Sequence, residues 1–326
     1  MGSAGGGTRA DHLGVMWVSL RSAALIAALA LGGLGVALFG GPSDASAAAP
    51  TASAPCIGSS APAHYAHVIV IVEENKAYDQ VMGHAPYQTA ISKACGYAAN
   101  MHAETYPSLP NYLAMTSGAV PAAVAGRDCQ PSGTCLANSP TIFDQTGGSW
   151  RVYAESMPSN CARKNTPDGL YVPRHTAAPY FTGLTAACLT RQLPLGTTTA
   201  GPFAAALKAG SLPEFTLVAP NTTNDAHGGC LSCADAWLAR WMPRIVASPA
   251  YQDGSTAIFV TYDSDNASAK NHIATTVIAP SVKPGTVAQG AFNHYSMLRT
   301  IEDVLGLPGH LGGAATAPSM TAAFNL

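Results

Sequence analysis

Short apolar runs recur along the chain after residue 63, and polar or turn-forming residues bound each of them. Runs of this length, several of them rich in Val, Ile and Thr, predict buried β-strands. The predicted strands span residues 68–72, 150–154, 215–219, 257–262 and 275–279. Because helical signals lie between them, the pattern predicts an α/β fold with a mostly parallel central sheet flanked by helices.

The helical signals are clearest in three segments. Residues 110–117 end at Gly118 and residues 295–305 end at Gly306, and glycine suits the position just past a helix. Residues 234–246 form the third, with a kink expected at Pro243.

The first 50 residues have a different composition from the rest. Arg9 and Arg21 precede an apolar run over residues 23–39, and overlapping Ala-x-Ala tripeptides follow at residues 45–49. This order is typical of a signal peptide, with an uncleaved membrane anchor as the alternative. We therefore expect a signal peptide over residues 1–50, a linker over 51–62 and one catalytic domain over 63–326. The protein is expected to be secreted, with retention at the cell envelope as a second possibility.

Composition and cysteine content agree with an exported globular protein. The chain is 48% hydrophobic and 10% charged, with a net charge of −2, which argues against disorder and against a nucleic-acid partner. All eight cysteines lie beyond the apolar run, so disulfides are expected. Sequential pairing is the simplest scheme, and a redox or zinc role for Cys230 and Cys233 is the alternative.

Three of the predicted strands lead directly into acidic, amide or imidazole residues. In an open α/β sheet the carboxyl ends of parallel strands form the crevice where ligands bind, so these side chains are expected to meet. Carboxylate and amide oxygens suit Mg, Ca or Mn, and imidazoles favour Zn, so the metal is left open. The residues following the strands are Glu73, Glu74 and Asn75; Asn224, Asp225 and His227; and Asp263, Ser264 and Asp265.

Two hydroxyl groups, of Thr105 and Ser108, stand just before the helix predicted over residues 110–117. The free N–H groups and dipole of a helix start stabilise an ionised hydroxyl or a bound phosphate oxygen, and Asn111 can add an amide donor. The alternative is structural, with Ser108 capping the helix and Thr105 satisfying the turn.

Several motifs together resemble a known family. The chain is similar to the bacterial phosphoesterase family that contains phospholipases C and acid phosphatases, within the alkaline-phosphatase-like superfamily. It looks most similar to small secreted actinobacterial acid phosphatases, which include phosphatidylinositol 3-phosphate phosphatases. The motifs that carry the resemblance cover residues 68–75, 105–118, 150–158, 171–175, 224–227, 260–263, 280–285 and 293–296.

The resemblance implies roles for individual residues. Glu74, Asn75 and Asp263 would hold a divalent metal, and Thr105 would be both nucleophile and metal ligand because Thr105-Tyr106-Pro107 resembles the superfamily's Thr-x-Pro. Ser108 would then cap the helix or contact phosphate.

One position departs from the family pattern. Ser264 stands where relatives commonly carry a second acid. Either Asp265 replaces that acid through a shifted loop, which we expect, or the site has lost a ligand.

Histidines and arginines are candidates for contacts with phosphate or metal. His227 is the best placed, His175 and His294 match family motifs but can be structural, and His272 is weaker. An imidazole of His227 or His175 would protonate the leaving alcohol. Arg151 and Arg174 can clamp phosphate, although single arginines are usually solvated or ion-paired.

The function implied is a metal-dependent phosphomonoesterase acting through a phosphothreonine or phosphoserine. The substrate is expected to be a phosphorylated small molecule or lipid headgroup, with a membrane only as a possible substrate surface, and the protein is expected to be a monomer. Phospholipase C is the alternative, and a secreted binding protein that has lost catalysis is a second one.

Overall fold

A computed structural model describes residues 54–326 of the chain. The predicted signal peptide and the start of the predicted linker lie outside the described residues. Within residues 54–326, every helix is too short or too polar to cross a membrane.

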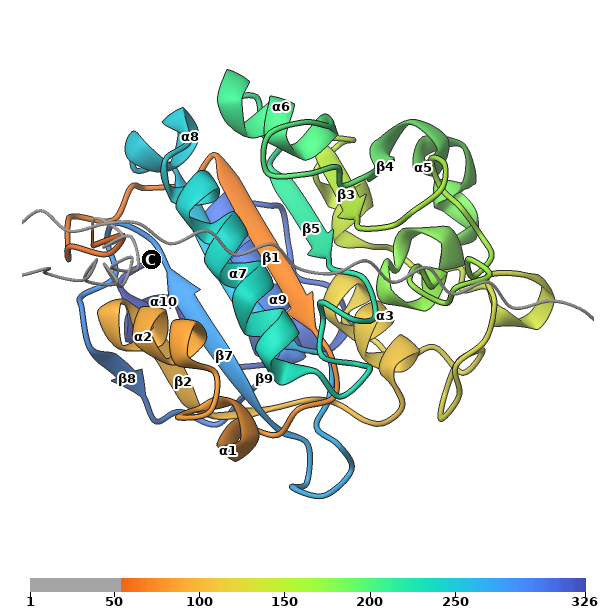
Figure 1. Ribbon diagram of the computed structural model, residues 1–326, viewed down its shortest axis with the longest axis horizontal. Coiled ribbons are helices and arrows are strands. Elements are labelled where there is room, and N and C mark those ends of the chain that lie inside the picture. Colours follow the sequence, from red (N-terminus) through yellow and green to blue (C-terminus); the bar gives the residue numbers. More distant parts are fainter. Residues whose placement is uncertain (1–53) are drawn as a thin grey trace, which may run out of the picture. The chain divides into compact units, whose positions relative to one another are not determined.

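A nine-stranded sheet forms the centre of the domain (Figure 1). Its order is β4-β3-β5-β1-β6-β7-β2-β8, and β9 pairs with β2 beyond this path. The strands are β1 (His67–Glu73), β2 (Gly96–His102), β3 (Trp150–Ala154), β4 (Gln192–Pro194), β5 (Phe215–Ala219), β6 (Thr256–Tyr262), β7 (His272–Ile278), β8 (Thr286–Ala288) and β9 (Phe292–Asn293).

The sheet is mixed rather than purely parallel, which corrects the prediction in part. Strand β7 runs antiparallel to both of its neighbours, β6 and β2, whereas the other pairs are parallel. Its direction follows from a short connection: only the loop 263–271 separates β6 from β7, and such a loop can join antiparallel but not parallel neighbours.

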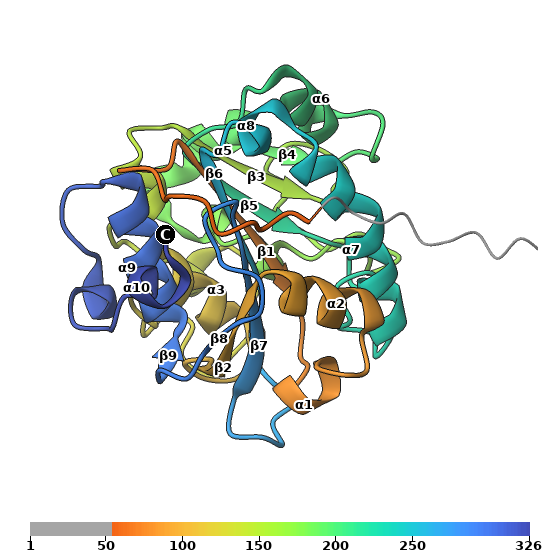
Figure 2. The ribbon, with the colours of Figure 1, turned by 90° about the vertical axis from the view of Figure 1, so that its left-hand side faces the viewer.

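Helices cover both faces of the sheet. Figures 1 and 2 show α2 and α7 on one face and α3 and α9 on the other. The α-helices are α1 (Tyr78–Val81), α2 (Pro86–Ala94), α3 (Ser108–Ser117), α4 (Ile142–Gln145), α5 (Thr185–Arg191), α6 (Pro202–Ala209), α7 (Leu231–Val246), α8 (Pro249–Gln252), α9 (His294–Leu305) and α10 (Thr321–Phe324). Short 3₁₀ helices span Gly133–Cys135, Pro173–His175, Ala178–Tyr180, Thr182–Leu184 and Gly312–Ala315.

The three predicted helices are confirmed as α3, α7 and α9. Gly118 and Gly306 end α3 and α9 in the left-handed conformation, with φ of 70° and 65°. Pro243 lies inside α7. Both faces of the central strands are covered, so β5 and β6 are buried at every residue and β1 at all but the first.

Four disulfides link the cysteines in sequential order, which confirms the predicted pairing. They join Cys56 to Cys95, Cys129 to Cys135, Cys161 to Cys188, and Cys230 to Cys233. The Cys56 bridge corrects the predicted linker. Residues 54–62 belong to the folded domain, because Ile57 and Ser59 also donate backbone hydrogen bonds to Pro280 O, each at 3.1 Å.

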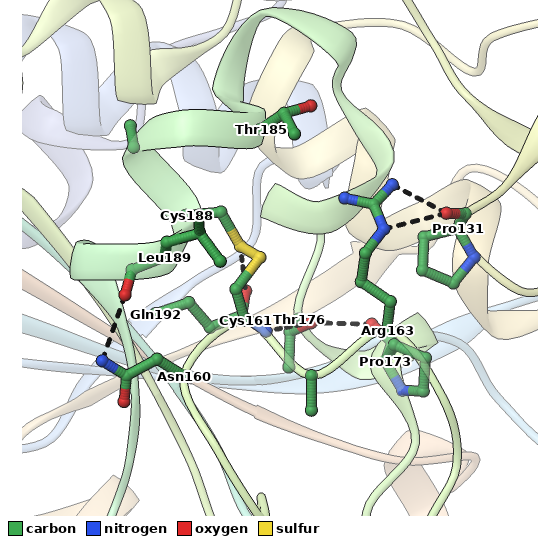
Figure 3. The surroundings of a disulfide bond; sticks show 12 residues. Pro131, Asn160, Cys161, Arg163, Pro173, Thr176, Thr185, Cys188, Leu189 and Gln192 are labelled. Carbon is green, nitrogen blue, oxygen red and sulfur yellow. Dashed lines mark hydrogen bonds between the residues drawn. A yellow bond between two sulfur atoms is a disulfide. The ribbon is translucent and has the colours of Figure 1, made fainter.

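The Cys161–Cys188 disulfide fastens an irregular segment of the chain to α5 (Figure 3). Next to it, Cys161 N donates to Gln192 O at 3.1 Å. The buried Gln192 side chain in turn donates to Tyr171 Oη and Thr176 Oγ1, both at 3.2 Å. These bonds hold the 3₁₀ helix Pro173–His175 from both sides, and that helix carries Arg174 and His175.

A buried carboxyl group in α9 lacks a full set of partners. Leu311 N donates to Glu302 Oε1 at 2.9 Å, but Oε2 has no hydrogen-bond partner among the described residues. Burial raises the pKa of Glu302 from its ordinary 4.5 to about 7. The folded protein therefore favours protonated Glu302, and ionisation costs stability increasingly as the pH rises from 4.5 through 7.

We expect Glu302→Gln to raise the melting temperature by about 2–4 °C at pH 8 and to change it little at pH 4.5, because glutamine keeps the contact with Leu311 without the charge. The neighbouring Asp303 supplies a contrast. A hydrogen bond with Ser319, followed by the contacts with His310 and Arg299, outweighs its burial and lowers the pKa of Asp303, so Asp303→Asn should destabilise the protein at pH 8. Thermal melts of both variants across this pH range measure the effect. A Glu302→Gln protein less stable than wild type at pH 8 would contradict it.

Candidate active site

The three predicted strand ends meet because β5, β1 and β6 are neighbours in the sheet. Glu74 N donates to Asp225 O at 2.7 Å, and Asp263 N donates to Glu73 O at 2.9 Å. These backbone bonds extend the pairing beyond the strands and fix the three segments side by side. The site therefore lies at the carboxyl ends of parallel strands, as the sequence predicted.

The carboxylate of Glu74 is the hub of the site and is fully buried. Ser108 Oγ donates to its Oε2 at 2.8 Å, and His227 Nδ1 lies 3.3 Å from the same oxygen. His175 Nε2 lies 3.2 Å from Oε1. A hydroxyl and two imidazoles therefore converge on one carboxylate.

Asp263 and Asn75 lie against this hub. Asn75 N donates to Asp263 Oδ1 at 2.9 Å, and the Asn75 amide nitrogen is 3.3 Å from both Asp263 oxygens. The same nitrogen is 3.5 Å from Ser108 Oγ. Asn75 adopts a φ of 51°, which turns its side chain into the site. Burial, followed by the charge of Glu74, raises the pKa of Asp263 well above its usual range.

Thr105 lies on the turn before α3, and its hydroxyl does not join the carboxylates. Its described partner is the neighbouring carbonyl, Tyr106 O, at 3.4 Å. Ser108, the first residue of α3, contacts Glu74 instead. The two candidate nucleophiles, Thr105 and Ser108, thus differ in their partners: only the hydroxyl of Ser108 contacts Glu74.

Asn111 has a different role from the one predicted. Its buried amide holds the turn: Oδ1 accepts from Glu104 N and Thr105 N at 3.1 and 3.0 Å. Its Nδ2 donates to Thr105 O and Pro107 O at 2.9 and 3.1 Å. Its donors and acceptor are thereby engaged by backbone groups of the turn before α3.

The loop after β6 also departs from the prediction. Both oxygens of Asp265 accept backbone N–H groups of its own loop, from Ala267, Ala269 and Asn271. Ser264 occupies the site: its hydroxyl donates to Asp263 Oδ2 and accepts from the Asn75 amide, both at 3.1 Å. The carboxylate of Asp265 thus organises the loop rather than replacing the acid absent at Ser264.

The two histidines at the hub differ in environment. The His175 side chain is 3% exposed and bridges Glu74 and Asp225, with Nδ1 3.1 Å from Asp225 Oδ2. Burial lowers the pKa of His175 to about 4 and raises that of Asp225 to about 7. The His227 side chain is 32% exposed, and its hydrogen bond with Glu74 raises its pKa. His227 is therefore partly open to solvent, whereas His175 is enclosed between Glu74 and Asp225.

Arg174 reaches the site beside His227. Its guanidinium lies 3.3 Å from His227 Nε2 and 3.3 Å from Asp128 Oδ2. The other oxygen of Asp128 accepts from Leu109 N, in the first turn of α3, at 2.9 Å. Asp128 was not predicted as a site residue, because it follows no strand and lies in an irregular segment. Arg151 does not join this group; it donates to Trp150 O at 2.7 Å.

The remaining candidates have structural roles. His294 is buried, with Nε2 3.0 Å from Tyr262 O, and burial lowers its pKa to about 4. His272 stacks on Tyr78, with ring centroids 4.6 Å apart. Glu73 is fully buried, and burial followed by the charge of Asp225 raises its pKa well above the usual range.

The chemistry of the cluster fits a divalent cation. Glu74 and Asp263 are buried acids linked through Ser108 and Asn75, and the nearby Lys76 ammonium is directed at backbone oxygens of Asn75 and Ala226. Burying two carboxylates with no cationic side chain between them lowers the stability of the folded protein unless a cation is bound. Glu74, His175 and His227 also present ligand atoms within 4.8 Å of one another, so nitrogen donors are available to the same carboxylate.

Comparison with protein families shows the family of the chain. The Phosphoesterase family model matches residues 84–308, which is most of the chain. The chain belongs to the phosphoesterase family. The resemblance seen in the sequence motifs is thereby confirmed.

Relatives of this phosphoesterase include named phosphatases. It is 31% identical over 262 residues to a phosphatidylinositol-3-phosphatase of Mycobacterium tuberculosis, covering 79% of this chain and 82% of the relative. It is 29% identical to a phosphate-repressible acid phosphatase of Penicillium chrysogenum, covering 64% of this chain and 52% of the relative. It therefore spans about half of the fungal protein.

A solved structure of an alkaline phosphatase superfamily protein from Vibrio parahaemolyticus shares the fold of this phosphoesterase. The TM-score is 0.51 at 14% identity, covering 79% of this chain and 71% of the other. This likeness supports the predicted α/β fold with helices on a central sheet, although the sheet is mixed.

We expect removal of divalent cations by a chelator to lower the melting temperature of the phosphoesterase at pH 8 by about 5 °C or more, because the buried carboxylates then repel each other. Adding back Mg, Mn, Ca or Zn should restore it, and the most effective ion indicates the metal. Asp263→Asn should lose most of this response, whereas the exposed Asp79→Asn should keep it. Equal responses of the two variants would show that Asp263 holds no cation.

Proposed function

We propose that the protein is a secreted, metal-dependent phosphomonoesterase that works through a phosphoserine on Ser108. The observation that carries the proposal is the Ser108 hydroxyl at the start of α3, 2.8 Å from the buried carboxylate of Glu74. Membership of the phosphoesterase family and the phosphatase names of its relatives support the reaction type. The disulfides support an oxidising compartment.

Ser108 is better placed than Thr105 to attack phosphorus. Its hydroxyl contacts Glu74 and Asn75, and it opens a ten-residue helix whose positive end favours an oxyanion. Thr105 contributes its backbone to the turn, which Asn111 holds. We therefore propose that Thr105 has a structural role in the turn before α3 and is not the nucleophile.

Glu74, Asn75 and Asp263 would hold the divalent cation, with the Ser264 hydroxyl beside them. A half-turn of the Asn75 amide presents its oxygen to such an ion. When bound, the cation neutralises the phosphate charge and lowers the pKa of the attacking hydroxyl.

The protons can be followed through the Glu74–His227 pair. As Ser108 Oγ bonds to phosphorus, its proton passes to this pair, and His227 gives a proton to the departing alcohol as the P–O bond breaks. In the second step His227 takes a proton from the attacking water. Phosphate then leaves, and the Ser108 oxygen regains its proton from the pair.

Arg174 is placed to bind phosphate oxygens during both steps. It is the cationic side chain nearest His227, and Asp128 fixes its guanidinium relative to the first turn of α3. A planar guanidinium can donate two parallel hydrogen bonds to a phosphate. Arg174 and Ser108 therefore act on the same group.

The substrates we propose are phosphate monoesters of small alcohols or lipid headgroups, acted on by a monomer. A panel of phosphoinositides, phosphatidylcholine, nucleotides and sugar phosphates, with and without chelator, tests the proposal. Release of phosphocholine from phosphatidylcholine without free phosphate would favour the phospholipase C alternative. Absence of turnover on the whole panel would favour a binding protein.

We expect Ser108→Ala to lower kcat by at least about 10³-fold, because it removes the attacking oxygen. Thr105→Val is the matched control: it removes only a hydroxyl that contacts a backbone carbonyl, and its kcat should stay within about threefold of wild type. Steady-state kinetics on phenyl phosphate and mass spectrometry of the trapped phosphoenzyme measure both. The reverse result, an active Ser108→Ala and an inactive Thr105→Val, would return the role to Thr105.

We expect His227→Gln to lower kcat/KM about 100-fold on phenyl phosphate, whose leaving group needs a proton. On 2,4-dinitrophenyl phosphate, whose leaving group departs as an anion, the loss should be below about tenfold. The exposed His84→Gln serves as control and should resemble wild type on both esters. Equal losses of His227→Gln on the two esters would mean that His227 does not protonate the leaving group.

A further inference from the structure

A pocket of about 230 Å³ opens between the loop after β6 and the turn before α3. Its lining residues are Tyr106, Asp265, Ala267, Lys270 and Asn271. Tyr106 lies two positions before Ser108, and Asp265 lies two positions after Asp263. The pocket is therefore built from the same two segments that carry the proposed nucleophile and a proposed cation ligand.

The two sides of the pocket are tied to each other. Asn271 Nδ2 donates to Thr105 O at 2.8 Å, and Ala103 N donates to Asn271 O at 2.9 Å. Within the loop, the Asp265 carboxylate accepts hydrogen bonds from three backbone N–H groups, at 2.6, 2.6 and 2.9 Å. The loop after β6 thus has a fixed position relative to the turn before α3.

The backbone of this loop is also strained. Ala267, Lys270 and Asn271 have φ values of 63°, 55° and 59°, in the left-handed region that residues with a side chain seldom adopt. Strain of this kind persists where surrounding contacts enforce it, and it is concentrated at ligand-binding segments. Here the hydrogen bonds to Asp265 enforce it.

The chemistry of the walls suits an alcohol that carries a negative charge. Lys270 is exposed, and its ammonium forms no hydrogen bond or ion pair within residues 54–326. The nearest pocket acid, Asp265, already accepts three N–H groups. Tyr106 is 50% exposed, so its ring is accessible to a molecule that enters the pocket.

We propose that this pocket receives the alcohol portion of the phosphate ester and selects alcohols that bear a second anionic group, with Lys270 pairing with that anion and Tyr106 packing against the alcohol. The inference rests on the proposed phosphatase function, because the segment that carries Ser108 also lines the pocket through Tyr106. It narrows the substrate class to phosphate monoesters of anionic alcohols.

Two matched esters test the selection: phenyl phosphate and 4-carboxyphenyl phosphate, which differ by one carboxylate on the leaving group. Lys270→Met keeps the length and apolar stem of lysine and removes its charge. It should lower the ratio of kcat/KM for the carboxylated ester over the plain ester by about tenfold. The exposed Lys93→Met on α2 is the control and should keep the wild-type ratio. A Lys270→Met ratio within twofold of wild type would overturn the proposal.

Tyr106→Ala supplies a second readout. It should lower kcat/KM for both aromatic esters by a similar factor of about fivefold, leaving the ratio unchanged, because the ring contacts the part that they share. Unchanged kinetics of Tyr106→Ala on both esters would place the alcohol elsewhere. If the wild-type protein turns over neither ester with any of Mg, Mn, Ca and Zn, the phosphatase function fails; if it turns over both without dependence on Lys270, only the pocket assignment fails.

The anionic alcohol can come from a soluble metabolite or from a lipid headgroup. A last experiment distinguishes binding of the headgroup by Lys270 from binding of the membrane surface by Lys270. Phosphatidylinositol 3-phosphate in phosphatidylcholine vesicles and its water-soluble dibutanoyl form share a phosphodiester on the leaving alcohol. Lys270→Met should impair both forms equally. Impairment in vesicles alone would show that Lys270 binds the membrane surface, and would overturn the assignment.

Discussion

The burial of two carboxylates at the ends of adjacent strands is the constraint on which the rest of this site depends. Glu74 and Asp263 follow β1 and β6, and neither is accessible to solvent. Water cannot hydrate their charges, so hydrogen-bond donors or a bound cation must stabilise each carboxylate, or the carboxylate must itself take up a proton. Ser108 donates to Glu74, Asn75 donates to Asp263, and the His227 imidazole lies 3.3 Å from Glu74, which explains why the proposed nucleophile and proton-transfer groups gather at one point.

The sheet supplies only half of the site, and irregular chain supplies the other half. Arg174 and His175 arrive on a 3₁₀ helix that no strand positions, so their placement depends on the Cys161–Cys188 disulfide and on buried Gln192. Asp128 similarly lies on a connecting segment, yet it links Arg174 to α3. Contacts between residues far apart in the sequence thus fix the positions of Arg174 and His175.

The sequence predicted those features that follow from local pattern. The strands β1, β5 and β6, helix α3 with its terminal glycine, the disulfide pairing and the convergence of Glu74 on Asp263 were all readable from periodicity, spacing or family motifs. The direction of β7 and the short strands β8 and β9 were not, because pairing partners decide them and local sequence does not.

Side-chain direction was the other limit. Thr105 and Ser108 have the same chemistry three residues apart, and only the geometry of the turn shows which hydroxyl faces Glu74. Asp265 and Asn111 carry suitable groups, but backbone N–H and C=O groups engage them. A motif shows which residue stands at a position, whereas the role of that residue depends on which groups its side chain contacts in the folded protein.

The Cys161–Cys188 bridge also links catalysis to compartment. In a reducing cytoplasm this bond does not persist, and the segment that carries Arg174 and His175 then loses its covalent attachment to α5. Ser108 and Glu74, held by the sheet and α3, need no such attachment. Oxidation of Cys161 and Cys188 therefore couples the placement of Arg174 and His175 to the redox state of the compartment, whereas the placement of Ser108 and Glu74 does not depend on it.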